Sequence, residues 1–256
     1  LTKVRKEKGD KVIADIKVDD AVLGMRGLPV LFYDGTSLDP IQGITFRGHS
    51  IPEFAKNHKK FMEGVAITRS YVLSFADGKY PTNSQLHELQ KEWRIRGDLC
   101  EKTKKFILNL PREFHPMTML SMTLLYLQPN SKFFKAYQSG VHKSKYWEYY
   151  YEDAIDLLAD YRTFAQLFTD INTDTPNLLL LIIIWIGLET SAYAWLSKQR
   201  NEVVLRAYLS IHSDHEGGNV SAHTAHLVGS ALADPYLSYS AAMDGLAGPL
   251  HGLANQ

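Results

Sequence analysis

The sequence predicts a mainly α-helical protein with a small β appendage near its N-terminus. Apolar residues recur at helical spacing along most of the chain after residue 50, whereas β-branched residues and turn signals gather before it. Hydrophobic residues make up 45% of the 256 residues, which is enough for a sizeable core. We therefore predict an N-terminal segment with short strands over residues 1–50 and a helical domain over residues 51–256.

The N-terminal segment is expected to contain a few short strands and no large sheet. Residues 12–18 alternate partly between polar and β-branched side chains, which favours a strand. Residues 31–33 lead into the turn signal Asp34-Gly35, and a second β-rich stretch follows at residues 44–46.

Helices are indicated by N-terminal signals and by apolar periodicity. Pro52 suits a first helical turn, and residues 82–85 form a cap in front of an amphipathic stretch that reaches Trp93. His115 and Pro116 begin another helix. Further helices are predicted at residues 147–161, 203–211 and 222–232. The last of these is small and apolar, which is typical of a tightly packed, buried helix.

Composition argues against several classes of protein. Lys+Arg and Asp+Glu number 28 each, which gives no support to a nucleic-acid partner. The nine consecutive apolar residues at 178–186 are too few for a membrane span, which needs about 20, so we expect either a buried helix or an anomaly of the sequence there. Cys100 is the single cysteine, which excludes an intrachain disulfide and fits a reducing compartment.

The most informative stretch is residues 211–226, which contains four of the ten histidines. They are His212, His215, His223 and His226. A helix is expected to end at Gly217-Gly218 and another to begin near Asn219 or Ser221, since both residues are good N-caps. His215 would then lie at a corner between helices, where an imidazole and backbone N–H groups can bind an anion.

Two other interpretations of these histidines stay open. A histidine on an apolar helix face is most often a satisfied core residue, which is the favoured interpretation of His223 and His226 taken alone. The pairs 212/215 and 223/226 are also spaced i,i+3, so each pair could share a metal ion. A zinc site has little support, because no cysteine or further carboxylate follows at a recognisable spacing.

Residues 245–256 place His251 among three glycines and a proline. Gly248-Pro249 fixes a turn, and Gly252 permits close approach by backbone or ligand. The histidine is therefore expected to be exposed on a loop corner rather than buried in a helix. Spacing alone favours an ordinary glycine-rich loop.

Many segments, in their order and spacing, resemble citrate synthases of the eukaryotic mitochondrial type. Besides residues 211–226 and 245–256, they are residues 24–27, 38–40, 43–44, 46–48, 50–53, 115–117, 145–148, 151–154, 228–232 and 234–237. The resemblance implies a helical large domain that condenses acetyl-CoA with oxaloacetate and water to citrate and CoA in the tricarboxylic acid cycle. It further implies an acyltransferase without metal or organic cofactor, a homodimer, and a location in the mitochondrial matrix. Neither nucleic acid nor a membrane is an expected partner.

The resemblance assigns roles to residues in the two informative stretches. His251 matches the catalytic histidine that stabilises the acetyl-CoA enol, and His215 matches a histidine that binds oxaloacetate. Asn219 and Ser221 lie beside the site and are expected to shape it. No residue is assigned to a metal.

Two cations are assigned to CoA by the same resemblance. Arg26 matches an arginine that contacts the CoA phosphates. Lys143 occupies a position where the family often has arginine, and lysine keeps the charge but loses the bidentate geometry.

The chain departs from the family in two ways. The family's second catalytic histidine and catalytic aspartate lie beyond Gln256 with the small domain, so we expect an inactive amino-terminal fragment whose small domain is missing. Residue 1 is Leu rather than Met, so we expect the true start to be missing as well. Residues 177–195 lack the family's polar Trp-Ser-x-Asn-Phe segment. Codons for residues 186–191, read one base out of frame, can encode Trp-Ser-Gly-Asn-Phe. We therefore expect a frame error, with real divergence as the alternative, and resequencing separates the two.

Three other functions stay open at this point. One is a non-catalytic relative kept for binding or assembly, another is a 2-methylcitrate synthase that uses propionyl-CoA, and the third is a metal hydrolase built on the four histidines. The mass of the native protein, the rates with the two acyl-CoA substrates and a metal analysis would distinguish them.

Overall fold

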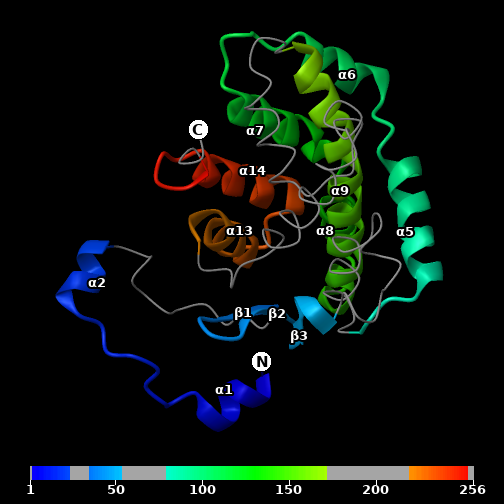
Figure 1. Cartoon of the computed structure of the whole chain (residues 1–256). Coiled ribbons are helices and arrows are strands. Elements are labelled where there is room, and N and C mark those ends of the chain that lie inside the picture. Colours follow the sequence, from blue (N-terminus) through cyan, green and yellow to red (C-terminus); the bar gives the residue numbers. More distant parts are fainter. Residues whose placement is uncertain (1, 24–34, 54–78, 172–218, 253–256) are drawn as a thin grey trace. The chain divides into compact units, whose positions relative to one another are not determined.

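The computed structural model describes residues 2–23, 35–53, 79–171 and 219–252. They belong to two compact units, Leu1–Phe32 and Tyr33–Gln256. Helices dominate, and the described strands form one three-stranded sheet (Figure 1), so the predicted fold class is confirmed. The domain boundary expected between residues 50 and 51 stays a prediction. The helix expected at 203–211 and the suspected frame error at 177–195 lie outside the described residues.

The first unit contains α1 (Thr2–Lys8) and α2 (Val18–Leu23). The strand predicted at residues 12–18 is wrong: residues 11–17 have no regular structure, and α2 begins at Val18, where the Lys17 N–H donates to the Asp20 carboxylate at 2.9 Å. An alternating pattern becomes a strand only when a second strand supplies hydrogen bonds, and none of the described strands pairs with this segment. Val12 is accordingly 80% exposed.

The sheet consists of antiparallel strands β1 (Thr36–Asp39), β2 (Gly43–Phe46) and β3 (His49–Ser50) in the order β1-β2-β3. The strand predicted at residues 44–46 is confirmed, whereas residues 31–34 lie outside the described residues. Arg47 and Gly48, between β2 and β3, have φ angles of 49° and 82°, the conformation of a tight two-residue hairpin turn.

The predicted helix start at Pro52 is also confirmed, because residues 51–53 are helical. Ser50 and Glu53 form a capping box: the Ser50 N–H donates to the Glu53 carboxylate at 2.7 Å, and the Glu53 N–H donates to the Ser50 hydroxyl at 3.3 Å. This local exchange of hydrogen bonds ends the sheet and starts the helical part of the chain.

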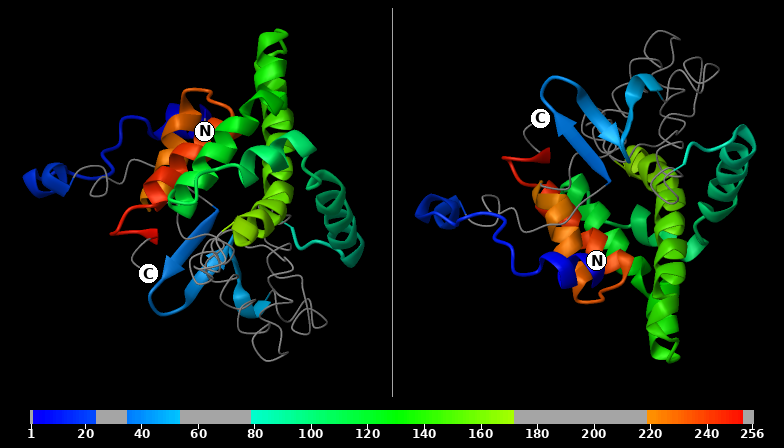
Figure 2. Two further views of the ribbon diagram at one scale, coloured as in Figure 1. Left: turned by 90° about the horizontal axis from the view of Figure 1, so that it is seen from above. Right: turned by 90° about the horizontal axis from the view of Figure 1, so that it is seen from below.

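The remaining described elements of the second unit are helical (Figure 2). They are α5 (Asn83–Arg96), α6 (Glu101–Leu108), α7 (Pro116–Leu127), α8 (Lys132–Gln138), α9 (Tyr146–Ile171), α13 (Val220–Ser230) and α14 (Pro235–Leu246), with the 3-10 turns η3 (Gln128–Asn130) and η4 (Lys143–Lys145). One predicted cap and one predicted helix start are confirmed. Thr82 forms a capping box with Gln85, and the His115 Nδ1 accepts from the Met117 N–H at 3.2 Å.

One hydrophobic core joins α6, α7, α9 and α14. Met119, Leu120 and Leu124 of α7 and Phe168 of α9 are fully buried in it. The prediction that the helix around residues 222–232 is buried is wrong, because no residue of α13 is buried. The small residues of α13 allow close contact with α14. The prediction failed because the periodicity of a short apolar stretch does not show how many faces of the helix other elements cover.

A network of ion pairs connects α5, α8 and α9. Arg96 of α5 contacts Glu152 at 2.7 Å and Asp156 at 2.8 Å, both on α9. Lys132 of α8 contacts the same two carboxylates, at 3.1 Å and 2.7 Å. Each cation therefore pairs with both of these α9 acids, and Arg96 also pairs with Glu92 of its own helix at 2.7 Å. Each α9 acid in turn pairs with two helices besides its own.

Asp153 is a fully buried carboxylate that caps α8 from α9. It accepts hydrogen bonds from the Ser131 hydroxyl at 2.6 Å, the Lys132 N–H at 2.7 Å and the Phe133 N–H at 3.1 Å. Asp153→Ala should lower the free energy of unfolding by roughly 2–4 kcal/mol, because three donors lose their acceptor. Urea denaturation measures this, with Asp153→Asn as the milder control because its amide oxygen still accepts. A loss within experimental error for the alanine variant would contradict the capping role.

Candidate active site

The N-terminal turn of α13 is held by Asn219. Its side-chain oxygen Oδ1 accepts from the Ala222 N–H at 2.9 Å, and its backbone is extended, as an N-cap requires. The predicted start of a helix near Asn219 or Ser221 is confirmed, whereas Gly217-Gly218 lies outside the described residues. The cap fixes the Asn219 side chain beside the first turn of α13, where Ser221 follows.

The loop after α14 carries His251 back toward that turn. The chain leaves α14 at Leu246, and the His251 N–H donates to the Gly248 carbonyl at 2.9 Å, which confirms the turn expected at Gly248-Pro249. His251 lies in the loop, as predicted, but it is half-buried rather than exposed. Its ring reaches α13, and spacing along one loop gives no sign of such a contact.

The contact that brings the two parts together joins Ser221 and His251. The Ser221 Oγ lies 2.9 Å from the His251 Nε2 and 2.6 Å from the Asn219 Oδ1. Asn219 Oδ1 can only accept, and the serine has a single hydroxyl proton. If serine donates to Asn219, the ring must carry its proton on Nε2. If serine donates to Nε2, a neutral ring carries its proton on Nδ1. Whether the Ser221 hydroxyl donates to the Asn219 cap or to the ring therefore determines which nitrogen of His251 carries the proton.

Burial lowers the pKa of His251 below its ordinary value of 6.5. The ring is therefore neutral at neutral pH, with one nitrogen as donor and the other as acceptor. A neutral imidazole in a partly buried site can donate a hydrogen bond to a developing oxyanion, because donors in such sites act with little competition from water.

The structure brings together three of the six predicted site residues, namely Asn219, Ser221 and His251. Lys143 lies exposed on η4 and, among the described residues, makes no hydrogen bond to them. Arg26 and His215 lie outside the described residues. Gly245 packs against this cluster but was not among the predicted site residues, although a glycine inside a helical stretch is a usual sign of close packing.

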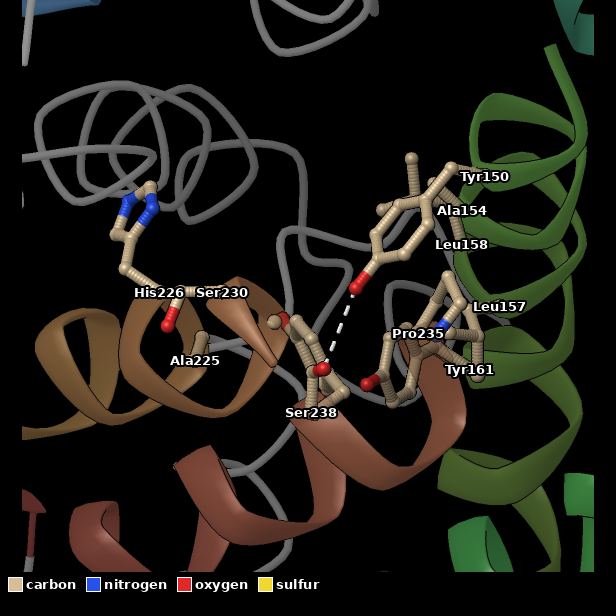
Figure 3. A pocket seen from close by; sticks show the side chains of 12 residues that line it. Tyr150, Ala154, Leu157, Leu158, Tyr161, Ala225, His226, Ser230, Pro235 and Ser238 are labelled. Atoms are coloured by element: carbon tan, nitrogen blue, oxygen red, sulfur yellow. Dashed lines mark hydrogen bonds between the residues drawn. The ribbon is translucent and has the colours of Figure 1, made fainter. Parts of the chain in front are cut away.

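A second candidate is a cavity of about 610 Å³ between α9, α13 and α14 (Figure 3). It is lined mainly by apolar and aromatic side chains, and the Tyr150 hydroxyl donates to the Ala233 carbonyl at 2.9 Å and lies 3.3 Å from the Ser238 hydroxyl. His226 lines it but is exposed, and His223 is only partly buried, so the interpretation of both as core residues is wrong. Among the described residues that line the cavity there is no carboxylate.

Among the described residues, no group of three or more His, Cys, Asp or Glu side chains is placed to hold a metal ion. None of the helices that the structure describes is both long and apolar enough to cross a membrane.

The chain matches one family of known proteins along nearly its whole length. Residues 24–256 match the family model described as citrate synthase, C-terminal domain. The mitochondrial citrate synthases of Tetrahymena thermophila and Kajikia audax are each 44% identical to the chain, over 281 and 261 residues. The alignments cover 100% and 98% of this chain but only 57% and 54% of the relatives, so the chain spans about half of their length.

Two solved structures share the fold. The citrate synthase of Pyrobaculum aerophilum has a TM-score of 0.72 at 23% identity, and the match covers 96% of this chain and 60% of that one. The citrate synthase of Thermoplasma acidophilum was solved in a ternary complex with carboxymethyl coenzyme A and oxaloacetate. It has a TM-score of 0.63 at 16% identity, and the match covers 87% of this chain and 55% of that one. The fold is therefore that of the citrate synthases. With the match over residues 24–256, the chain belongs to the citrate synthase family.

Proposed function

We propose that the whole protein is a citrate synthase, an acyltransferase that condenses acetyl-CoA with oxaloacetate and water to citrate and CoA. One observation supports this above all: His251 is held against Ser221 at the capped N-terminus of α13, inside the stretch that matches the family. A 2-methylcitrate synthase would use the same arrangement on propionyl-CoA. The ratio of the rates with acetyl-CoA and propionyl-CoA distinguishes the two enzymes, and we expect the rate with acetyl-CoA to be higher.

His251 acts on the thioester oxygen of acetyl-CoA. A carboxylate removes a methyl proton, and His251 stabilises the resulting enol by hydrogen bonding to that oxygen. Nε2 faces Ser221, whose hydroxyl donates to the Asn219 Oδ1. For Nδ1–H to donate to the substrate, that hydroxyl must turn from Asn219 to Nε2. Asn219 orients Ser221. The reaction uses no metal or organic cofactor beyond the substrates.

The substrates are held by residues assigned from the family resemblance. His215 binds oxaloacetate, and Arg26 and Lys143 contact the phosphates of CoA. All three lie within the matched stretch, and the Thermoplasma acidophilum relative was solved with a CoA derivative and oxaloacetate. The catalytic aspartate and a second catalytic histidine belong to a small domain beyond residue 256 in this proposal.

The whole protein is proposed to be a homodimer in the mitochondrial matrix. The matrix location is supported by the relatives at 44% identity, which are named mitochondrial citrate synthases. Light scattering after gel filtration tests the dimer, and fractionation of the source cells tests the location.

Residues 1–256 alone should form no citrate, because the proposed aspartate is outside them. The measurement is release of free CoA from acetyl-CoA and oxaloacetate, made in parallel on the isolated chain and on the native protein. The native protein, identified by a peptide spanning residues 212–226, should have a mass well above 29.0 kDa. A mass near 29.0 kDa would favour a binding or assembly role over catalysis. Citrate formation by the isolated chain would contradict the proposal that the catalytic aspartate lies outside residues 1–256.

A further inference from the structure

Gly252, the residue after His251, makes a close approach to α14. A Cβ at this position would lie 2.5 Å from the Leu246 carbonyl oxygen and 3.1 Å from two carbons of the Leu246 side chain. The nearest atom belongs to the backbone of the last helical residue, so it cannot turn away as a flexible side chain could. The predicted close approach at Gly252 is thus made by backbone, and it folds the His251 loop against the end of α14.

Gly245 makes a second close approach, between α14 and the first turn of α13. A Cβ there would lie 3.2 Å from the Val220 Cγ1 and 3.7 Å from the Ser221 Cα. A methyl group could fit only if the Val220 side chain, or the first turn of α13 that carries it, moved by a few tenths of an ångström. The absence of a side chain at Gly245 therefore allows Ser221 to lie close to α14. The absence of a side chain at Gly252 allows the loop that carries His251 to lie close to the end of α14.

We infer that Gly245 and Gly252 are positioning residues, which together hold the Ser221 hydroxyl and the His251 ring at hydrogen-bonding distance. The 2.9 Å contact tolerates little displacement, because hydrogen bonds weaken steeply once distance and angle depart from their optimum. This inference rests on the proposed function only in that His251 is taken as the catalytic group.

Gly248 offers a matched control in the same loop. A Cβ on Gly248 would have only the Gly245 carbonyl oxygen nearby, at an ordinary contact distance of 3.5 Å. Gly248→Ala therefore changes the same loop by the same methyl group without a close approach. If the loop merely needed flexibility, Gly248→Ala and Gly252→Ala would act alike.

The test is NMR of the full-length protein labelled with ¹⁵N-histidine, with His251→Gln used to assign the ring signals. Gly252→Ala should shift the Nε2 and Nδ1 signals of His251 and move its titration toward that of an exposed histidine, whereas Gly248→Ala should leave both unchanged. Unchanged signals in Gly252→Ala, or equal changes in the two variants, would overturn the inference.

A second pair of variants decides the matter if Gly252→Ala fails to fold. Gly245→Ala should disturb the His251 signals and lower kcat roughly 10-fold, because small misplacements of catalytic groups are costly. Val220→Ala removes the Cγ1 that the new methyl would meet, so the double variant should restore both readouts. Failure of the double variant to restore them would refute the Gly245 contact. Absence of citrate formation by the unsubstituted protein would refute the proposed function and leave the NMR result interpretable.

Discussion

Replacing His251 by alanine should lower kcat of the full-length enzyme by roughly 1,000-fold while the fold is retained. The ring is the group proposed to stabilise the enol, so its loss removes an interaction made mainly in the transition state. Because His251 is only half-buried on a loop, its removal leaves no large cavity in the core. Steady-state citrate formation measures the rate, and circular dichroism checks the fold.

Two further variants sharpen that result. Ser221→Ala removes the partner of Nε2 and should lower kcat by about 10-fold, less than removal of the ring itself. Lys143→Ala should raise KM for acetyl-CoA and leave kcat nearly unchanged, since Lys143 lies apart from the cluster and is proposed to bind phosphate. A His251→Ala enzyme with nearly normal kcat would show that another group stabilises the enol.

Replacing Asp160 by asparagine should stabilise the protein, and more so at higher pH. Asp160 is 7% exposed, and burial raises its pKa to about 8, with the charges of Asp156 and Cys100 adding to the effect. The folded protein therefore keeps this proton up to about pH 8, whereas the unfolded chain releases it near the ordinary value of 3.8. Between these values the folded state binds more protons, so the free energy of unfolding falls as pH rises from 4 to 8.

Asp160→Asn removes this slope, because the amide does not ionise. We expect the variant to match the parent near pH 4 and to exceed it by roughly 4–6 kcal/mol at pH 8, measured by urea denaturation at a series of pH values. Asp156→Asn, one helical turn earlier, is the matched control. It should destabilise the protein instead, because Asp156 pairs with Arg96 and Lys132. Equal slopes in the parent and in Asp160→Asn would refute a buried, protonated Asp160.

Features set by a few neighbouring residues were predictable from the sequence. Thr82 and Gln85, and Asn219 ahead of α13, are caps whose donors and acceptors lie within three residues of one another. The strand expected at residues 12–18 was wrong because strand formation depends on a distant partner. The burial expected for α13 was wrong because a small apolar helix can cover one neighbour and leave its other faces exposed.

The candidate site was predictable in its residues but not in its connections. Family resemblance identified His251, Ser221 and Asn219. The hydrogen bond between Ser221 and His251 joins residues thirty positions apart and depends on how α13 packs against α14, which no local pattern encodes. The contact of Gly245 with Val220 and Ser221 was likewise not predictable, because it depends on the packing of α14 against the first turn of α13.

The ion pairs shared by Arg96, Lys132, Glu152 and Asp156 have a consequence for how the helices open. Two cations on different helices compete for the same two acids on α9, so release of one helix changes the charge balance that holds the other. Helices α5 and α8 are therefore coupled through α9, although they are far apart along the chain. In hydrogen exchange, their amides should lose protection together as salt concentration rises, as one cooperative unit.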